Sequence, residues 1–240
     1  MLIFIIIVNN TLKSLLPTVL STETQTLASR AFESIKSDII AGRLSQGTKI
    51  VESDLALKYG ISRGPLREAI HRLEQIRLVV RVPHAGSRVV ALDSKMIEDI
   101  YVARECLEGM AARLAARHMT DEDIRSLMEL LNQHERDIGK AEGKFYFQSE
   151  GNIDFHYRIA VASQNRWILD NLNGELYQLI RMCRHQSGQA PARPQISLEQ
   201  HRQIASAIAF RDEELAELLM RRHISGAWKI VKTILEEKHE

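Results

Sequence analysis

Three histidines and an asparagine in the second half of the chain have the types and spacing of a metal site. Asn152 and His156 stand four residues apart in GNIDFHYRIA, so on a helix they share one face. His201, in LEQHRQIASAI, and His223, in LMRRHISGAW, belong to two further segments with a helical pattern. Because an amide oxygen and neutral imidazoles can converge on one cation, these residues predict a divalent metal centre, with zinc or nickel the expected ion.

A second group with chemical potential lies in ISRGPLREAIHRLEQIRLVV, residues 61–80. Its apolar residues recur at helical spacing, which places Arg63 and Arg67 together on the opposite, outer face. The start of a helix carries the positive end of the dipole and unpaired N–H groups, which favour phosphate, and arginine also reads guanine in the major groove. This face is therefore suited to nucleic acid.

The residues that open this predicted helix agree with such a surface. Ser62 is placed as its N-cap. Gly64 has no side chain at the point where the helix start would approach the backbone of a nucleic acid. Pro65 falls within the first turn, where its missing N–H removes no intrahelical hydrogen bond.

Charge is divided unevenly along the chain, although the net charge is only +1. Residues 30–90 hold 11 lysines and arginines against six acids, and residues 91–240 hold 20 against 24. A front part of +5 ahead of an acidic part of −4 indicates that the front part meets a polyanion.

The elements that must position the two arginines form a recognisable series. Helical spacing over 26–41 ends at Gly42, a short helix capped by Ser53 ends at Gly60, and the helix after Ser62 follows. LVVRV and SRVVAL flank PHAG and predict a hairpin with Gly86 in its turn and His84 beside it. Three helices and a hairpin predict a winged helix-turn-helix.

From residue 94 onward the pattern is helical. Thr120 with Asp123 and Ser197 with Gln200 have the spacing of capping boxes, and Asp212 marks another helix start. The predicted helices form an antiparallel all-α bundle and cover 94–118, 121–140, 144–164, 166–188, 197–211 and 213–237. The fold class is mainly α, with a small β-hairpin wing.

The segments GRLSQGTKI, ESDLALKYGISRGPLREAIHRLE and PHAGSRVV resemble the N-terminal winged helix of the GntR family of transcriptional regulators over about residues 27–92. The resemblance implies a homodimer that binds palindromic operator DNA. The DNA contacts that it implies are Ser62, Arg63, Gly64, Arg67, His84 and Gly86. Some members carry a DNA-contacting arginine where this chain has Ser53, so no contact is expected there.

Residues 95–235 are similar to the FadR-type (FCD) ligand-binding bundle, whose metal-binding members carry Asp or Asn four residues before a histidine and two later histidines. This resemblance implies that Asn152, His156, His201 and His223 bind the metal and that the effector is a small carboxylate. It places Arg104 in the effector pocket, with Gln178 and Arg181 as weaker candidates. An ion pair between Arg104 and Glu108 one turn on explains Arg104 equally well.

Residues 1–24, with the apolar start MLIFIIIVNN, are interpreted as a poorly specified extension, residues 25–92 as the DNA-binding domain and residues 93–240 as the effector-binding and dimerisation domain. The apolar start is too short to span a bilayer, so no membrane partner is expected; a short membrane anchor is the alternative interpretation. Cys106 and Cys183 are predicted to be buried thiols of a cytoplasmic protein.

Two other functions compete with a metal-dependent regulator. The helical part could be a metal-free dimerisation bundle in which the histidines are incidental. It could also be a metalloenzyme, but no carboxylate stands at a convincing spacing to act as a general base, so we expect a protein that is not an enzyme.

Overall fold

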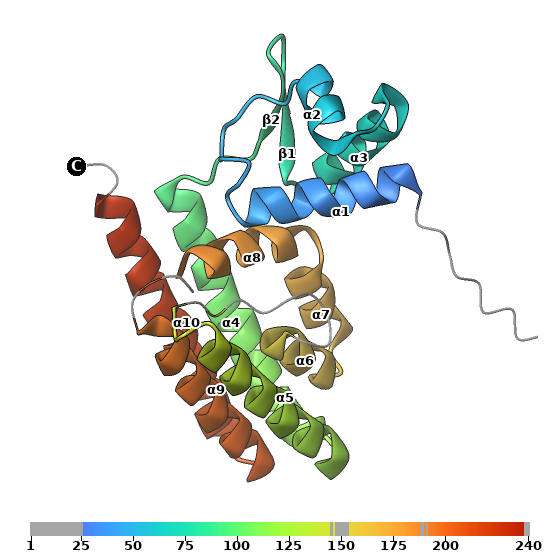
Figure 1. The fold of residues 1–240 in the computed structure, drawn as a ribbon. Coiled ribbons are helices and arrows are strands. Elements are labelled where there is room, and N and C mark those ends of the chain that lie inside the picture. The colour runs from blue at the N-terminus through green and yellow to red at the C-terminus, as the bar shows by residue number, and fades with distance from the viewer. Residues whose placement is uncertain (1–25, 145, 147–153, 188–189, 191, 238–240) are drawn as a thin grey trace, which may run out of the picture.

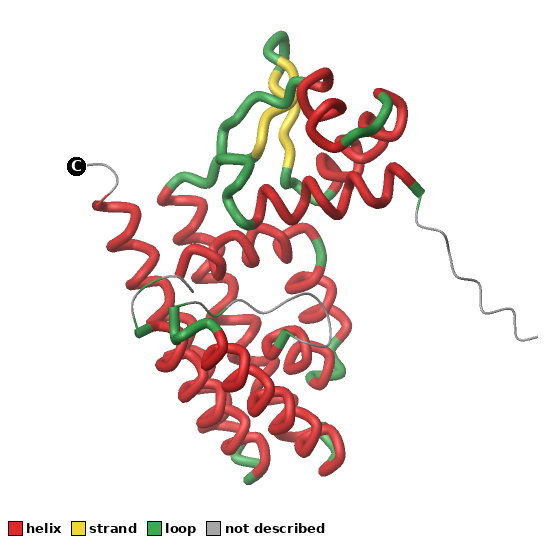
Figure 2. The backbone as a smooth tube through the Cα atoms, viewed as in Figure 1, coloured by secondary structure: helices red, strands yellow, loops and turns green. Residues whose placement is uncertain are grey.

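A computed structural model describes residues 26–144, 146, 154–187, 190 and 192–237 of the 240-residue chain. In this described part, ten helices and one two-stranded sheet form a small front part and a larger helical bundle (Figure 1). The tube view separates them clearly, because the two strands occur only in the front part (Figure 2). The prediction of a mainly α fold with a hairpin wing is confirmed. Residues 1–24 of the proposed extension lie outside the described residues.

The front part is a three-helix unit with a hairpin. Its elements are α1 (Leu27–Ile40), α2 (Glu52–Tyr59), α3 (Arg63–Gln75), β1 (Val79–Val82) and β2 (Gly86–Val89). The strands are antiparallel, with Val79 opposite Val89 and Val82 opposite Gly86. The apolar stripes of α1 and α3 pack against each other, so the polar side of α3 is left facing outward.

Two glycines allow the sharp turns in the front part. Gly60 ends α2 with a φ of 63°, and Gly86 begins β2 with a φ of 84°. Both angles are in the left-handed region, which favours glycine because it lacks a Cβ atom. The first turn sets α3 against α2, and the second closes the wing.

Asp38 on α1 ties the front part together. Its carboxylate accepts hydrogen bonds from Lys58 Nζ (2.8 Å), from the Tyr59 hydroxyl (2.7 Å) and from Arg43 Nε (2.7 Å). Partial burial by itself raises the pKa of Asp38, but these three donors outweigh it and lower the pKa to about 2. The ionised carboxylate therefore holds α2, and the loop between α1 and α2, onto α1.

The helical bundle consists of α4 (Ser94–His118), α5 (Asp121–Lys140), α6 (Phe155–Ala162), α7 (Arg166–Asn173), α8 (Glu175–Ser187), α9 (Arg193–Ala209) and α10 (Glu213–Glu237). The two longest helices, α4 and α10, pack along each other, while α5 lies on α9 and α6 on α4. The predicted capping box of Thr120 and Asp123 is present, and Asp212 accepts from Leu215 N as a helix start should.

Several predicted boundaries are wrong. The helix predicted over 166–188 is divided at Gly174, whose ψ of −134° is not helical and where a Cβ atom would lie 2.4 Å from the Asp170 carbonyl oxygen. Within 144–164 the described helix α6 begins only at Phe155. Helix α9 begins four residues before the predicted cap Ser197, with Pro194 in its first turn. Ser53 is not a cap either, because α2 already begins at Glu52.

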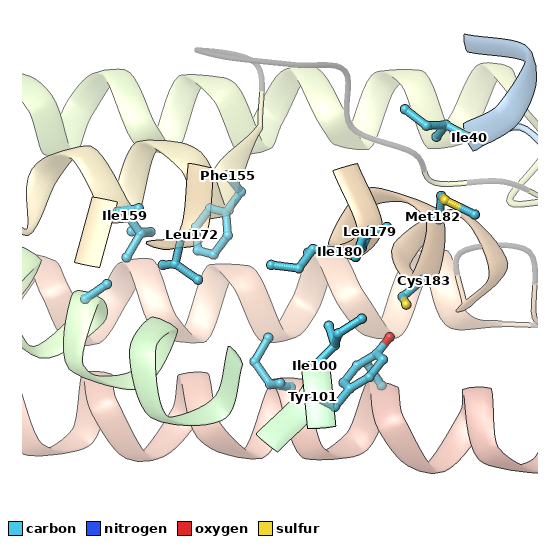
Figure 3. Packing of buried hydrophobic residues seen from close by; sticks show 14 of the residues in the cluster. Ile40, Ile100, Tyr101, Phe155, Ile159, Leu172, Leu179, Ile180, Met182 and Cys183 are labelled. Carbon is cyan, nitrogen blue, oxygen red and sulfur yellow. The ribbon is translucent and has the colours of Figure 1, made fainter. Parts of the chain in front are cut away.

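A continuous apolar core fills the bundle and reaches the front part. Figure 3 shows Tyr101 of α4, Phe155 of α6, Leu172 of α7 and Ile180 of α8 within one cluster. Helix α1 packs on α8, and Ile40 belongs to this same cluster. The two parts therefore share apolar contacts through α8.

The two cysteines differ from each other in their surroundings. Cys183 is buried, as predicted, and burial raises the pKa of its thiol to about 11. Cys106 is exposed on α4, so the prediction of burial is wrong there; its helical spacing did not identify which side of α4 faces solvent. Among the described helices none is long and apolar enough to cross a membrane.

Replacing Asp38 with Asn should lower the free energy of unfolding by about 1–2 kcal/mol at pH 7, because the depressed pKa reflects stabilisation of the ionised form. This stabilisation exists above the unfolded-state pKa near 4 and is lost as the pH falls from about 4 to about 2. Urea unfolding across this range should show the two proteins converging. Asp99→Asn, at an exposed ion pair on α4, is the control that should change little.

Candidate nucleic-acid surface and metal centre

The outer face of α3 presents the residues predicted to contact nucleic acid. Ser62, Arg63, Gly64 and Arg67 are all exposed at the start of the helix. Ser62 occupies the predicted N-cap position in extended backbone, but its side chain makes no capping hydrogen bond. Its hydroxyl, both guanidinium groups and the first N–H groups of α3 are therefore presented on one side of the molecule.

The arginines of α3 have different roles. Arg67 Nε lies 2.8 Å from Glu52 Oε2, an exposed ion pair that contributes little stability and can exchange for a phosphate. Arg72 instead lies over the ring of Phe32 at 4.1 Å and donates to Ser29 Oγ, so it joins α3 to α1. The basic surface is thus limited to the first turns of the helix.

The wing turn carries the other two predicted contacts. His84 is exposed with a φ of 60°, and Gly86 is exposed at the beginning of β2. Arg88, by contrast, donates from Nη1 to the Gly47 carbonyl oxygen and fixes the base of the wing. The tip of the hairpin is exposed and could approach the backbone of a nucleic acid.

Inside the bundle, three of the four predicted metal ligands meet. His156 of α6, His201 of α9 and His223 of α10 are buried, and one nitrogen from each lies within 4.8 Å of the others. The Nε2 atoms of His201 and His223 are 3.2 Å apart. We call these three residues the histidine triad. Residues from three separate helices converge here, as predicted.

Each triad histidine is held through Nδ1 by an oxygen atom. His156 Nδ1 is 2.5 Å from Glu108 Oε2, His201 Nδ1 is 3.1 Å from the Tyr146 hydroxyl, and His223 Nδ1 is 2.8 Å from Gln200 Oε1. The hydrogen-bond network assigns the proton of His156 to Nδ1, opposite the carboxylate, and leaves Nε2 with a lone pair. Outer partners of this kind orient metal-binding histidines in proteins.

The protonation of the triad also fits a cation. Burial lowers the pKa of His156 and places the pKa values of His201 and His223 well below the usual range. The imidazoles are therefore neutral at physiological pH, which is the form that ligates a metal. The donor set, its protonation and its outer partners suit zinc or nickel.

Glu108 connects the triad to two arginines. Its Oε1 accepts from Arg104 Nε at 2.7 Å and lies 3.6 Å from Arg184 Nη2. Burial alone raises the pKa of Glu108, but Arg104, His156 and Arg184 outweigh it and hold the pKa well below its usual range. The ion pair expected as an alternative role for Arg104 is present. Its Nη1 atom is nevertheless buried without a hydrogen-bond partner, so Arg104 also keeps a donor to offer.

Gln178, Arg181 and Asn152 are the remaining predicted site residues. Gln178 and Arg181 are neighbours on α8, where Arg181 Nη1 donates to Gln178 Oε1 at 3.2 Å. Asn152 lies outside the described residues. Asp154 caps α6 from extended backbone by accepting from the His156 and Tyr157 N–H groups.

Sequence reasoning missed four residues that complete the site: Tyr146, Gln200, Arg184 and Glu108 in its contact with His156. Gln200 directly precedes His201, which was the one available signal. Tyr146 bonds to both His134 and His201, but no period or motif joins it to either residue.

Known protein families match both parts of the chain. The model of the family "Bacterial regulatory proteins, gntR family" matches residues 27–89, and the FCD domain model matches residues 99–226. The Nta operon transcriptional regulator of Aminobacter aminovorans is 30% identical over 74% of this chain and 81% of its own. The transcriptional repressor RspR of Escherichia coli K12 is 24% identical over 90% of this chain and 94% of its own.

A solved structure has the same fold. A GntR transcriptional regulator from Rhodococcus sp. RHA1 superposes with a TM-score of 0.67 at 22% identity, covering 86% of this chain and 97% of that protein. At this identity the likeness speaks for the fold alone.

Replacing Tyr146 with Phe should weaken zinc binding about 10-fold or more, because His201 loses the hydroxyl that orients its ring. Competition with a zinc-binding dye measures this directly. Tyr157→Phe, at the residue that directly follows His156 on α6, is the control. Equal zinc affinity of wild type and Tyr146→Phe would contradict the role given to the hydroxyl.

Proposed function

Because the chain belongs to the GntR family of bacterial transcriptional regulators and carries an FCD domain, we propose that it is a repressor whose helical part binds a small organic acid through a divalent metal. The observation that carries the metal is the histidine triad, with an oxygen partner on every Nδ1 atom. Its relatives are transcriptional regulators, and regulation rather than catalysis is the activity of the family.

We propose that residues 25–92 bind operator DNA through the start of α3 and the wing. Arg63, Arg67 and Ser62 would contact base edges and phosphates, and Gly64 would allow close approach of the helix to the duplex. His84 and Gly86 would follow the backbone or minor groove. The exposure of all six residues and the inward packing of α3 support this assignment.

A homodimer follows from the size of the surface. One α3 helix covers only half a site, whereas a two-fold pair would match a palindromic operator with half-sites about one helical turn apart. Residues 93–240 would form the effector-binding and dimerisation unit. A regulator of this type acts on DNA in the bacterial cytoplasm, where we place it.

His156, His201 and His223 would hold zinc or nickel, and Asn152 remains a further proposed ligand. The metal, when bound, supplies open coordination positions for a carboxylate. Arg104 lies next to the triad through Glu108 and offers its unpartnered Nη1 to the same group, while Gln178 and Arg181 are proposed at the edge of the pocket.

Helix α8 would transmit the effector signal. Its Arg184 donates to Asp154 at 2.7 Å beside the triad, and its other contacts reach α1 of the DNA-binding part. A ligand shifts an equilibrium only through unequal affinity for two arrangements. An effector that changes the charges around Arg184 would thereby favour one position of α8, and with it one setting of the two α3 helices.

Replacing Arg63 with Ala should weaken operator binding about 10- to 100-fold, because a bidentate contact to a base is lost. The operator would be selected from random DNA duplexes with the wild-type protein, and affinity measured by fluorescence anisotropy. Arg125→Ala, an exposed arginine on α5, should bind normally. Unchanged affinity and sequence preference of Arg63→Ala would remove α3 from the DNA contact.

Zinc with a bound carboxylate should raise the melting temperature by about 5–10 °C when the ligand concentration is about 100 times the dissociation constant. Binding to the folded state then adds about 2.7 kcal/mol to the free energy of unfolding. A variant with Gln at His156, His201 and His223 should lose the shift and its metal content, whereas His71→Gln, on the surface of α3, should keep both. Equal metal content in the two variants would favour the metal-free dimerisation bundle.

A further inference from the structure

Arg193 is a buried cation that has no carboxylate partner in the described part of the chain. It is the first residue of α9 and only 4% exposed. No ion pair joins it to an acid among the described residues, and its side-chain hydrogen bond there is a long one, 3.4 Å from Nη1 to Gln200 Oε1. Isolated charges are costly to bury, and proteins rarely leave one uncompensated.

The guanidinium of Arg193 is one side chain away from the triad. Gln200 Oε1, which faces Arg193 Nη1, also accepts from His223 Nδ1 at 2.8 Å. Arg104 has the corresponding relation on the other side, where Glu108 bonds to Arg104 Nε and to His156 Nδ1. Two arginines therefore bracket the triad, each through one shared partner.

Among the described residues, the charges that contact the triad or its hydrogen-bond partners do not cancel. The cations of this set are Arg104, Arg184 and Arg193, and its acids are Glu108 and Asp154. Arg104 and Arg184 are ion-paired to these two acids, which leaves in this set a surplus of one positive charge, located at Arg193. A divalent ion on the neutral triad would increase the surplus further. Burial lowers the pKa of Arg193, and the nearby Arg104 cation lowers it further. Both effects agree with a positive charge that is not neutralised.

From this arrangement we propose that the effector is a dianion, a short dicarboxylate, with one carboxylate at the triad and Arg104 and the second at Arg193. The inference rests on the proposed function, since it specifies the ligand of the same site. A monocarboxylate would satisfy the metal side and leave Arg193 unpaired. A second carboxylate would accept charge-assisted hydrogen bonds from Arg193, which the described residues of the chain do not provide.

The test compares acids that differ only in a second carboxylate. Isothermal titration of the zinc-loaded full-length protein would use succinate against butyrate and malate against 3-hydroxybutyrate. The wild type should bind at least one dicarboxylate about 10- to 100-fold more tightly than its monocarboxylate partner, as expected for a hydrogen-bonded charge. Arg193→Gln should reduce this ratio to about 2-fold or less, and Arg193→Lys should retain part of it.

Arg202→Gln is the matched control, because Arg202 lies on the exposed side of α9 in an ion pair with Glu135 and should leave the preference unchanged. Stability provides a second measurement. If Arg193 binds ligand, Arg193→Gln removes an unmet charge, and the ligand-free protein should melt at the same or a higher temperature. A lower melting temperature together with an unchanged dicarboxylate preference would show that Arg193 serves the fold and would overturn the proposal.

The outcomes separate this inference from the function on which it rests. Equal wild-type affinity for both members of each pair would overturn the dianion while leaving a carboxylate-binding regulator. Binding of none of the four acids, with zinc loaded and DNA binding intact, would contradict both.

Discussion

The carboxylate of Glu108 lies inside the bundle, where an ionised acid is tolerated only when its neighbours neutralise it. Arg104 of the same helix and Arg184 of α8 supply the opposite charge, and the neutral imidazole of His156 on α6 donates a hydrogen bond, so one carboxylate positions three helices. The same carboxylate sets the ring of His156. The packing of the bundle and the geometry of the triad consequently depend on one group, and loss of this acid would disturb both.

The charge around the triad differs in sign from that of the bundle as a whole. Residues 91–240 carry a net charge of −4, yet the described side chains that contact the triad or its partners have a positive surplus. The acids that make this half negative lie mainly outside, in exposed pairs such as Glu213 with Arg117. Exposed charges are screened by water and salt much more than buried ones, so under the proposed function the interior cations would govern the choice of ligand.

In the front part, apolar packing and one ionised carboxylate likewise set the position of α3. The apolar faces of α1 and α3 pack together, and Asp38 holds α2 against them, so the start of α3 is exposed. Arginines with neighbours in the core, such as Arg72 over Phe32, stabilise the fold. Arg63 and Arg67, which are exposed, are the ones proposed to contact DNA. The packing of α8 on α1 links this surface to the triad.

The sequence by itself determined the elements whose signals are local. Helices α4 and α5 have the predicted bounds because capping and periodicity act within a few residues, and the three histidines were identifiable by type. Ser197 and Ser53 failed as caps because packing chooses among similar local signals. Only the tertiary structure decided which side chains meet: Glu108 and Tyr146 stand 48 and 55 positions from the histidines that they hold. Periodicity reports the face on which a residue lies, but the opposing face is set by how whole helices pack.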